Sequence, residues 1–458
     1  MQAISFGTDG WRAKLDEFTT ERVQIVTQGI ANHLQDIGGG GGSVAIGYDA
    51  RKSSPAFARS AANTLADNGF TVLLSQTDCP TPAAVYSIAD RDLQGAIVIS
   101  ASHNPPEYNG IKFFPSDAAP AMPDVTNSIE SRLTRPVSRS NGQQGDIHEV
   151  DFINPHLEHA RNLIDVDLED LTVVYDAMHG SGREATPRLL ESTGADVIQI
   201  RCERDPSFGG TPPEPSEENL QPLVNAVNEN EADIGIANDG DADRIAIVTP
   251  DRGFLDENLF FGAIYSHLLE SDSGPAIRTV STTFLIDCIA EAHGESVIEV
   301  PVGFKWVADA MEEHDALIGG EESGGFSIRG HIREKDGVLL ALVASEAAKS
   351  ANFDDRITEL LETHGEIHQS KTSIDCPDER KQAVLEALGQ ELPSTILDTP
   401  VDRVNDTDGF KILLEDGAWL LIRPSGTEPK LRIYAEAESR KRVENLLDFG
   451  KKLITPLI

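Results

Sequence analysis

Short apolar runs that end in polar loops recur along this chain. Residues 44–49 (V-A-I-G-Y-D), 172–176 (T-V-V-Y-D) and 233–239 (D-I-G-I-A-N-D) each predict a buried strand followed by a loop. Residues 54–68 and 184–193 carry apolar positions at the spacing of an amphipathic helix. Strands that alternate with helices predict α/β layers, in which ligands bind at the carboxyl ends of the strands.

The chain is long enough for about three to four domains, because it has 458 residues and one domain commonly takes about 100 to 200. The polar stretches 138–149 and 249–253 and the region 362–371 are the candidate boundaries. We therefore predict domains over residues 1–145, 146–250, 251–365 and 366–458. The five glycines of residues 38–42 predict a flexible loop without a function of its own.

The composition is strongly acidic. Asp and Glu number 76 against 38 Lys and Arg, which gives a formal charge of -38 and a pI near 4.5. Such a charge argues against binding nucleic acid or an anionic membrane. The acidity resembles that of proteins from salt-loving organisms, where about 1 M salt shortens the Debye length to about 3 Å and screens self-repulsion. We hypothesise a halophilic protein that needs molar salt to stay folded; an acidic mesophilic protein is the alternative.

Cysteine spacing and hydropathy predict a soluble cytoplasmic protein. The four cysteines lie far apart and form no C-x-x-C pair, so reduced core residues are expected rather than a zinc or redox site: Cys79, Cys202, Cys288 and Cys376. The start, M-Q-A-I-S-F-G, lacks a basic region followed by an apolar signal segment. No apolar run approaches the ~20 residues that cross a bilayer.

Residues 100–112, S-A-S-H-N-P-P-E-Y-N-G-I-K, concentrate unusual chemistry directly after the apolar run 95–99. Ser102 lies beside His103 in a loop that two prolines prevent from continuing as a helix or a strand. Its hydroxyl can therefore be held outward as a nucleophile.

Residues 238–244, N-D-G-D-A-D-R, supply three carboxylates at alternate positions after another apolar run, and these can turn their oxygens toward one Mg²⁺: Asp239, Asp241 and Asp243. A solvated acidic turn is the alternative. A helix-loop-helix calcium site is excluded, because Arg244 stands where that loop needs Gly and Pro250 where it needs Glu.

Two further segments suit a sugar phosphate. Residues 319–326, G-G-E-E-S-G-G-F, bring Glu321 and Ser323 together as acceptor and donor. Residues 423–434, R-P-S-G-T-E-P-K-L-R-I-Y, offer a cation, hydroxyls and backbone N–H groups to a phosphate dianion: Arg423, Ser425, Gly426 and Thr427. Taken singly, each segment could be a plain surface loop.

The order and approximate spacing of these four motifs, together with F-G-T-D-G-W-R at residues 6–12, resemble the alpha-D-phosphohexomutases, the phosphoglucomutase and phosphomannomutase enzymes. The resemblance extends over residues 6–434. It implies three related mixed α/β domains and a smaller C-terminal α+β domain around a central cleft. It also implies a monomer or a homodimer that binds a hexose phosphate and neither nucleic acid nor a membrane.

The resemblance also implies roles for individual residues. Ser102 matches the phosphoserine nucleophile, and an oxygen of its phosphoryl group would complete the Mg²⁺ ligands Asp239, Asp241 and Asp243. Other residues match positions around the reacting phosphate, with Lys112 a candidate for proton transfer: Arg12, His103, Lys112 and Arg244. The remaining matches grip the sugar hydroxyls or hold the phosphate that is not transferred: Glu321, Ser323, Arg423, Ser425, Gly426 and Thr427.

One departure concerns the sugar loop. Bacterial members resemble G-E-M-S-G-H there, with a His that can act as a base, whereas Gly325 stands in that place here. The segment I-R-E-K-D-G at residues 332–337 resembles the phosphoglucomutase branch and makes Lys335 the candidate for proton transfer. Similarly, P-V-G-F-K-W at residues 301–306 makes Lys305 a candidate substrate contact.

The implied reaction is phosphoryl transfer between the C1 and C6 oxygens of a hexose phosphate. These oxygens lie too far apart for direct displacement, so a phosphoserine carrier and a hexose 1,6-bisphosphate intermediate are required. Glucose 1-phosphate is the first choice, and mannose phosphate or dual specificity is the second. Glucosamine phosphate is less favoured, because that branch usually has Gln where Glu322 stands. Five cationic residues are expected to make the cleft locally positive: Arg12, Lys112, Arg244, Lys305 and Arg423.

Two functions of other classes stay open. A Mg²⁺-dependent sugar phosphatase with Asp239 as nucleophile would use the acidic motif, yet it leaves Ser102 and the Arg423 segment unexplained. A non-catalytic sugar-phosphate binding module would keep the same loops without turnover. The variant Ser102→Ala separates a mutase, which loses activity, from a phosphatase, which keeps it.

Overall fold

The first domain is a mixed sheet between helices. The computed structural model describes residues 4–7, 9–136, 144–426 and 428–458. The first sheet has the order β1-β5-β4-β2-β3-β6, with β5 antiparallel to its neighbours and the other pairs parallel. Its elements are β1 (Trp11–Lys14), α1 (Thr20–Asp36), β2 (Ser43–Tyr48), α2 (Ser54–Asp67), β3 (Thr71–Ser75), α3 (Thr81–Arg91), β4 (Gly95–Ile99), β5 (Tyr108–Pro115), α4 (Pro123–Glu130) and β6 (Ile147–Val150).

The second domain repeats this plan. Its sheet has the order β11-β10-β9-β7-β8, with β8, β7 and β9 parallel and β10 and β11 antiparallel. Its elements are α5 (Ile153–Leu163), β7 (Thr172–Asp176), η1 (Ser181–Glu184), α6 (Thr186–Ser192), β8 (Asp196–Ile200), η2 (Phe208–Gly210), α7 (Gln221–Glu229), β9 (Ile234–Asn238), β10 (Ile245–Thr249) and β11 (Gly253–Leu255). All residues of β4 and β9 are buried, as expected for inner strands of a sheet that helices cover on both faces.

The third domain has a sheet of order β13-β12-β14-β15, in which only β15 is antiparallel to its neighbour among the described strands. Its elements are α8 (Glu257–Leu268), β12 (Ala276–Thr279), α9 (Leu285–His293), β13 (Val297–Val300), α10 (Phe304–His314), β14 (Ile318–Gly320), β15 (Phe326–Ile328), α11 (Gly337–Ser350) and α12 (Phe353–His364). Helix α11 is apolar nearly all round and packs on both the second and the third domain.

The fourth domain is different. Its sheet, β16-β21-β20-β19-β18-β17, is antiparallel throughout the described strands. Its elements are β16 (His368–Asp375), α13 (Asp378–Gln390), β17 (Thr395–Ile396), β18 (Thr399–Asn405), β19 (Phe410–Leu414), β20 (Trp419–Pro424), β21 (Lys430–Ala437), α14 (Arg440–Ile454) and η3 (Thr455–Leu457). Three mixed α/β domains followed by one α+β domain confirm the fold class expected from the sequence.

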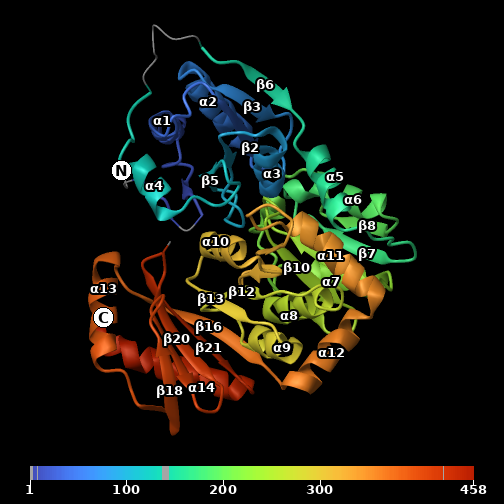
Figure 1. Ribbon diagram of the computed structural model, residues 1–458, viewed down its shortest axis with the longest axis vertical. Coiled ribbons are helices and arrows are strands. Elements are labelled where there is room, and N and C mark those ends of the chain that lie inside the picture. Colours follow the sequence, from blue (N-terminus) through green and yellow to red (C-terminus); the bar gives the residue numbers. More distant parts are fainter. Residues whose placement is uncertain (1–3, 8, 137–143, 427) are drawn as a thin grey trace.

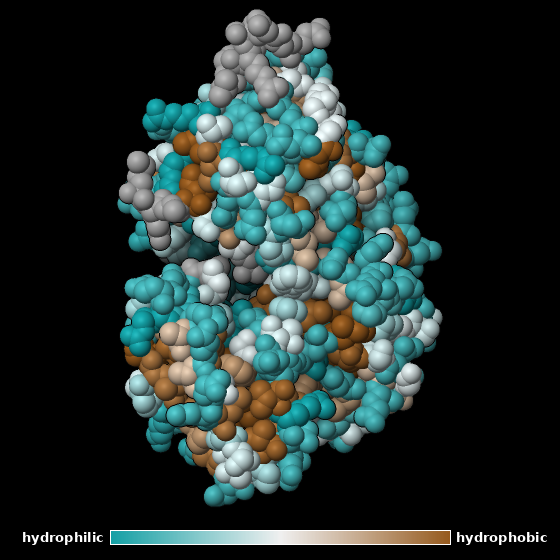
Figure 2. Space-filling model, turned by 60° about the vertical axis from the view of Figure 1, so that its left-hand side comes forward, coloured by the Kyte–Doolittle hydropathy of each residue, from teal (hydrophilic) through white to brown (hydrophobic). Residues whose placement is uncertain are grey.

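The four domains curve around a hollow. The first domain lies at one end of the molecule, and the fourth lies at the other end beside the third (Figure 1). The space-filling view shows this face hollowed between the upper and the lower part (Figure 2). One apolar cluster, which includes Val98, Ile236 and Ile264, continues through the first three domains, whereas the fourth has a separate cluster around Leu420 and Ile433. The first three domains therefore share a core, and the fourth docks on it.

Sheet membership suggests two shifts in the predicted boundaries. A boundary at 145/146 assigns β6 to the second domain, but β6 pairs with β3 of the first sheet. A boundary at 250/251 separates β11 from β10, although the two strands form a hairpin of the second sheet. We therefore propose that these boundaries lie after Val150 and after Leu255. The third boundary, at 365/366, falls between α12 and β16.

Two further expectations concerned the cysteines and membrane-spanning segments. All four cysteines are free; Cys79 and Cys376 are buried, whereas Cys202 and Cys288 are only partly buried. None of the helices in the described part of the chain is long and apolar enough to span a membrane.

Candidate active site

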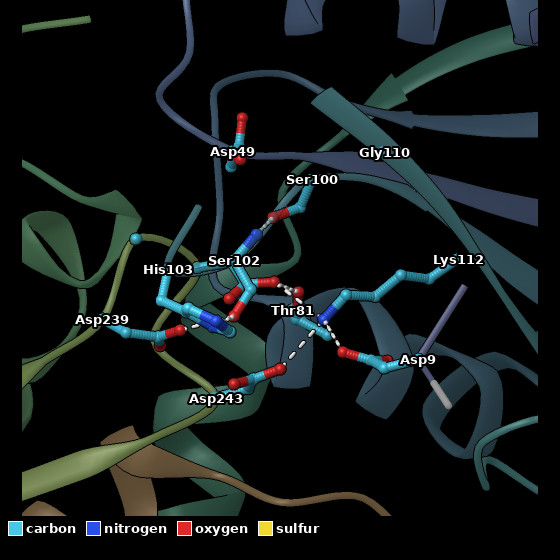
Figure 3. A network of polar contacts seen from close by, with 12 residues as sticks. Asp9, Asp49, Thr81, Ser100, Ser102, His103, Gly110, Lys112, Asp239 and Asp243 are labelled. Atoms are coloured by element: carbon cyan, nitrogen blue, oxygen red, sulfur yellow. Dashed lines mark hydrogen bonds and ion pairs between the residues drawn. The ribbon is translucent and has the colours of Figure 1, made fainter. Parts of the chain in front are cut away.

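Ser102 lies in the loop that follows β4 and is completely buried. Its φ angle of +50° is in the left-handed region, which serine rarely adopts. This backbone turn points Oγ at the loop after β9, where Oγ donates a hydrogen bond to Asp239 Oδ2 at 2.6 Å. The His103 ring also lies beside this hydroxyl, with Nδ1 3.3 Å from Oγ (Figure 3). The two sequence motifs that suggested chemistry therefore meet at this hydroxyl.

Pairing between β1 and β5 brings the N-terminal motif to the same place, because Arg12 lies opposite Gly110 in the register. Asp9 Oδ2 accepts a hydrogen bond from Arg12 Nη2 at 2.7 Å and lies 2.9 Å from Lys112 Nζ. Arg12 also donates from Nη1 to Asn104 Oδ1 at 3.1 Å. Asp9 was not among the predicted site residues, although it belongs to the T-D-G-W-R motif.

Lys112 extends from β5 into the acidic loop. Its Nζ donates to Asp243 Oδ2 at 2.9 Å (Figure 3) and to Asp241 Oδ2 at 3.0 Å. Burial opposes its charge, but the three surrounding carboxylates prevail and raise the pKa of Lys112. Lys112 thus adds no free positive charge to the cleft, contrary to the expectation from sequence.

The acidic loop is held from the first domain as well. Thr81, at the start of α3, donates from Oγ1 to Asp241 Oδ2 at 2.7 Å, and its backbone N–H donates to the Asp241 carbonyl at 2.9 Å. Burial opposes ionisation of Asp241, yet Lys112 and the Thr81 hydroxyl lower its pKa. Burial, together with the neighbouring Asp243 and Asp241, raises the pKa of Asp239 well above its ordinary value. Thr81 is a further residue that sequence reasoning missed.

The triad of Asp239, Asp241 and Asp243 fits a divalent cation. Its three completely buried carboxylates bring ligand oxygens within 4.8 Å of one another. Asp241 Oδ1 and Asp243 Oδ1 are buried without a hydrogen-bond partner, which is costly unless a cation takes them. Hard carboxylate oxygens of this kind suit Mg²⁺.

Charge balance supports the same conclusion. Five carboxylates and four cationic groups meet in one network, so its formal charge is -1 when every group is ionised: Asp9, Asp239, Asp241, Asp243 and Glu334 against Arg12, Lys112, Arg244 and Lys335. A divalent cation at the triad would change this formal charge to +1 and would favour a phosphate dianion beside it.

A second cluster that could hold a metal fits less well. His156 Nε2 and His331 Nε2 both lie near Asp336 Oδ2, at 2.5 and 2.9 Å. Both nitrogens are therefore already engaged in hydrogen bonds to the carboxylate, and Asp336 Oδ1 accepts from two backbone N–H groups of α11. The cluster is a hydrogen-bonded contact between α5 and the third domain, in which His156 Nδ1 alone of the three side chains' described polar atoms is buried without a partner.

Lys335 reaches the triad from the segment before α11. Its buried Nζ lies 2.7 Å from Glu334 Oε1 and 3.1 Å from Asp243 Oδ2. A Cβ atom at Gly325 would lie 2.7 Å from Lys335 Cδ, closer than real side chains allow. The glycine that replaces the expected His therefore leaves the space in which Lys335 lies. Burial opposes the charge of Lys335, but Asp243, Asp9 and Glu334 raise its pKa well above the ordinary value.

Arg244 follows the triad and is turned toward it. Its Nε lies 4.0 Å from Asp243 Oδ1, and its backbone N–H donates to Asp239 Oδ1 at 3.2 Å. The same Nε is buried and has no hydrogen-bond partner, so it is free to meet an anion. Burial, together with the cations Arg244 and Arg12, lowers the pKa of His103 well below its ordinary value, and the imidazole is neutral at pH 7.

The sugar loop follows β14, at the carboxyl end of that strand. Glu321 is buried, and its Oε1 accepts a hydrogen bond from Gly303 N at 2.9 Å, which joins it to the segment that carries Lys305. Burial and the adjacent Glu322 raise the pKa of Glu321 to about 7. Ser323 and Lys305 are partly exposed, and burial lowers the pKa of Lys305.

The phosphate loop lies at the end of β20 in the fourth domain. Arg423 Nε donates to Asp408 Oδ2 at 2.9 Å, and the same oxygen accepts from Val302 N at 3.1 Å. Asp408 thus ties this loop to the segment that also holds the sugar loop. Ser425 is buried and Gly426 is exposed, whereas Thr427 lies outside the described residues.

The structure therefore forms two groups from the predicted residues. Contacts join one group directly around the triad: Ser102, His103, Arg12, Lys112, Asp239, Asp241, Asp243, Arg244 and Lys335. The second group consists of Lys305, Glu321, Ser323, Arg423, Ser425 and Gly426, and it lies on loops of the third and fourth domains. Two polar residues were missed: Asp408, which lies outside the motifs, and Glu334, which lies beside Lys335 within I-R-E-K-D-G.

Comparison with known proteins identifies the class to which this fold and site belong. Models of the phosphoglucomutase/phosphomannomutase family match the chain domain by domain: alpha/beta/alpha domain I over residues 3–139, domain II over 154–253, domain III over 256–365 and the C-terminal domain over 372–450. The chain belongs to this family, the alpha-D-phosphohexomutases.

Similar proteins cover nearly the whole chain. A Methanopyrus kandleri protein named "Probable phosphoglucosamine mutase" is 33% identical over 97% of this chain and 96% of its own length. A Thermococcus kodakarensis protein named "Phosphoglucomutase/phosphomannomutase" is 31% identical over 98% of both chains. The crystal structure of a phosphoglucomutase/phosphomannomutase family protein from Burkholderia thailandensis superposes with a TM-score of 0.86 at 22% identity, covering 100% of this chain and 98% of the other. That structure supports the fold alone.

Proposed function

We propose that this enzyme moves a phosphoryl group between the C1 and C6 oxygens of a hexose phosphate through Ser102. The observation that carries the proposal is the buried Ser102 hydroxyl, turned by a left-handed backbone onto an acidic triad with unpartnered oxygens. A hydroxyl so placed suits a phosphoryl carrier.

The chain's own residues account for both halves of such a reaction. In the first half, a sugar hydroxyl oxygen bonds to phosphorus as the bond from phosphorus to Ser102 Oγ breaks. The proton of that hydroxyl ends on Oγ. In the second half, the bisphosphorylated sugar has turned over, and its other phosphoryl group passes to Oγ while the proton returns to the sugar oxygen. We assign His103 as the proton carrier, because its Nδ1 lies 3.3 Å from Oγ and the ring is neutral at pH 7.

The cationic residues position the transferring group. Arg244 Nε lacks a partner, and Arg12 is only partly buried, so both can donate to phosphoryl oxygens. Lys112 and Lys335 stay protonated among carboxylates and balance their charge. Asp239, Asp241 and Asp243 would hold Mg²⁺, which would neutralise charge on the phosphoryl group when bound.

The second group of residues would bind the rest of the substrate. Arg423, Ser425 and Gly426 form the candidate cradle for the phosphate that is not transferred, with Thr427 as the remaining predicted member. Glu321 and Ser323 would bind sugar hydroxyls, and Lys305 would contact the substrate beside them, because Glu321 accepts from Gly303 N in the segment that carries Lys305. Because the sugar must bind in two orientations, these contacts have to suit either end.

Glucose 1-phosphate is the substrate we assign first. The support is the pairing of Gly325 with Lys335, the combination in which this chain resembles the phosphoglucomutase branch. Glucosamine phosphate is the second candidate. Its C2 ammonium would be attracted by the adjacent carboxylates of Glu321 and Glu322, and several similar proteins carry a phosphoglucosamine mutase name. Mannose phosphate is the third.

The test is a comparison of kcat/KM for glucose, mannose and glucosamine 1-phosphates with Mg²⁺ and a trace of the matching bisphosphate. We expect interconversion with at least one sugar and a preference for glucose. Ser102→Ala should abolish interconversion without releasing inorganic phosphate. Sustained phosphate release by that variant would favour the phosphatase, and tight binding without turnover by the unmodified enzyme would favour a binding module.

A further inference from the structure

Arg51 is an almost completely buried arginine, with 1% of its surface exposed, and it lies three residues after the end of strand β2. Its guanidinium is not aimed at the cleft. It faces the backbone of the loop that carries Ser102.

Every N–H group of this guanidinium has a partner. Nη2 donates to the carbonyls of Ser102 at 2.8 Å and Asn104 at 2.6 Å. Nη1 donates to the carbonyls of Pro105 at 2.6 Å and Tyr108 at 3.2 Å. The fifth N–H, on Nε, donates to Asp49 Oδ2 at 2.9 Å. Four of the five N–H donors of Arg51 therefore bind carbonyls of the Ser102 loop.

Asp49 fixes the guanidinium in return. Its Oδ1 accepts from the Arg51 backbone N–H at 3.1 Å and from Ser54 Oγ at 2.6 Å. The carboxylate is thereby anchored to the start of α2. Arg51 consequently cannot turn away from the loop without breaking a buried ion pair.

The loop needs such support because Ser102 has a φ of +50°, a backbone conformation that glycine adopts easily but serine does not. A strained conformation of this kind persists only where surrounding contacts hold it. The Ser102 carbonyl, held by Arg51 Nη2, belongs to the same residue as the strained φ.

The second domain contributes to the same arrangement. The Phe208 ring covers the guanidinium, with 5.0 Å between Arg51 Cζ and the ring centroid. Phe208 itself is buried at the start of η2. The segment continues to Pro213, whose carbonyl accepts from Gly240 N in the triad loop at 3.2 Å. Arg51 thus lies between the Ser102 loop and a segment that also contacts the triad loop.

We propose that Arg51 is the positioning residue for the nucleophile: it holds the Ser102 loop in the conformation that aims Oγ at the triad, and Phe208 keeps its guanidinium in place. This role rests on the proposed function, because it presupposes that Ser102 carries the phosphoryl group. Lysine cannot replace Arg51, because a single ammonium cannot reach four carbonyls in a fixed planar fork.

The test compares Arg51→Lys and Phe208→Leu with the unmodified enzyme and with Arg356→Met. Arg356 is also a buried arginine, but it lies in α12 and pairs with Glu270, away from the Ser102 loop. We expect Arg51→Lys to lower kcat by about 100-fold, as loss of positioning commonly does. Its KM for the hexose phosphate should change by no more than about threefold, because the sugar loops are intact. Phe208→Leu should lower kcat by about 5-fold, and Arg356→Met should leave kcat unchanged.

A readout independent of turnover is the rate at which hexose 1,6-bisphosphate phosphorylates Ser102 in a single exposure. It should fall in parallel with kcat in Arg51→Lys. A kcat within about threefold of the unmodified value, or an equal loss in Arg356→Met, would overturn the assignment. Should Arg51→Lys fail to fold, Phe208→Leu decides, and an unchanged kcat there would refute the role. If Ser102→Ala keeps mutase activity, the proposed function fails; if Ser102→Ala is inactive and Arg51→Lys is fully active, only the Arg51 role fails.

Discussion

The proposed transfer centre around Ser102 and the candidate ligand-binding loops around Glu321 and Arg423 are built in opposite ways. In the transfer centre, buried side chains from three domains are joined by a continuous network of ion pairs and hydrogen bonds. The loops are partly exposed and are tied to each other through single contacts, such as those of Asp408. The fourth domain also has its own apolar core.

This difference matches the two tasks of the proposed reaction. Phosphoryl transfer needs atoms held within a fraction of an ångström, and a dense network supplies that precision. A sugar that binds in two orientations needs contacts that tolerate both. Substitutions should therefore lower kcat in the transfer centre and raise KM in the loops.

The largest effect is expected from Asp241→Asn. It removes one carboxylate of the triad and the partner of both Lys112 and Thr81, so kcat should fall by at least about 1000-fold. A Mg²⁺ titration of activity, with calorimetry of Mg²⁺ binding, should show a weakened site. Unaltered Mg²⁺ affinity in this variant would contradict the assignment of the triad.

Lys335→Met should lower kcat by about 100-fold, because it removes a buried cation from the network. Gly325→Ala should have a smaller effect in the same direction, about 10-fold, because its Cβ would push Lys335 aside. Lys349→Met, near the other end of α11, is the matched control and should behave like the unmodified enzyme. Full activity of Lys335→Met would remove Lys335 from the mechanism.

Arg423→Met should act mainly on substrate binding. Loss of a charge-assisted contact to the distant phosphate should raise KM by about 10-fold, with kcat falling by less than about threefold. Arg403→Met, an exposed arginine of β18 in the same domain, should leave both parameters unchanged. A large fall in kcat with an unchanged KM would contradict the claim that the loops act on substrate binding and the Ser102 region on turnover.

Glu321 should give the enzyme a pH dependence, since its pKa is raised to about 7. As an acceptor for sugar hydroxyls it must be ionised, so kcat/KM should decline as the pH falls through about 7. The folded state holds a proton here that the unfolded chain releases above its ordinary pKa of 4.5, so stability should rise as the pH falls from about 7 toward 4.5. Both trends should be weaker in Glu321→Gln, and a profile identical to that of the unmodified enzyme would contradict this assignment.

Salt should affect the stability of the whole protein, because the acidic residues are spread along the chain. It should therefore distinguish the Ser102 region from the Glu321 and Arg423 loops least. With a formal charge of -38, the melting temperature should rise by about 10 °C or more between 0.1 and 2 M KCl. Sucrose at matched osmolality controls for exclusion of cosolute from the protein surface. Equal melting temperatures in dilute buffer and in KCl would refute the halophilic hypothesis.

Much of this organisation could be predicted from the sequence. The strands β4 and β7 match the apolar runs 95–99 and 172–176. A strand that is buried on both faces has apolar residues at successive positions, so it can be recognised in the sequence. Ser102 and the triad, which the fold brings together, could be singled out because each belongs to a compact motif directly after such a run. Strands β6 and β11 were separated from their sheets, because a polar stretch before a strand resembles a domain boundary.

The supporting residues could not be predicted in the same way. Thr81 contacts Asp241 across 160 positions, and Arg51 contacts the Ser102 loop across 51. A single Thr or Arg has no local pattern that reveals a distant partner. The charge state of Lys112 was likewise hidden, because it depends on three carboxylates that only the fold brings together.

The most direct measurement is to expose the purified enzyme to hexose 1,6-bisphosphate labelled in its phosphoryl groups and to map the protein-bound label by mass spectrometry. The account predicts about one label per chain, on Ser102 alone, which a hexose monophosphate then removes. Label on Asp239, or rapid interconversion of hexose phosphates with no label on Ser102, would contradict it.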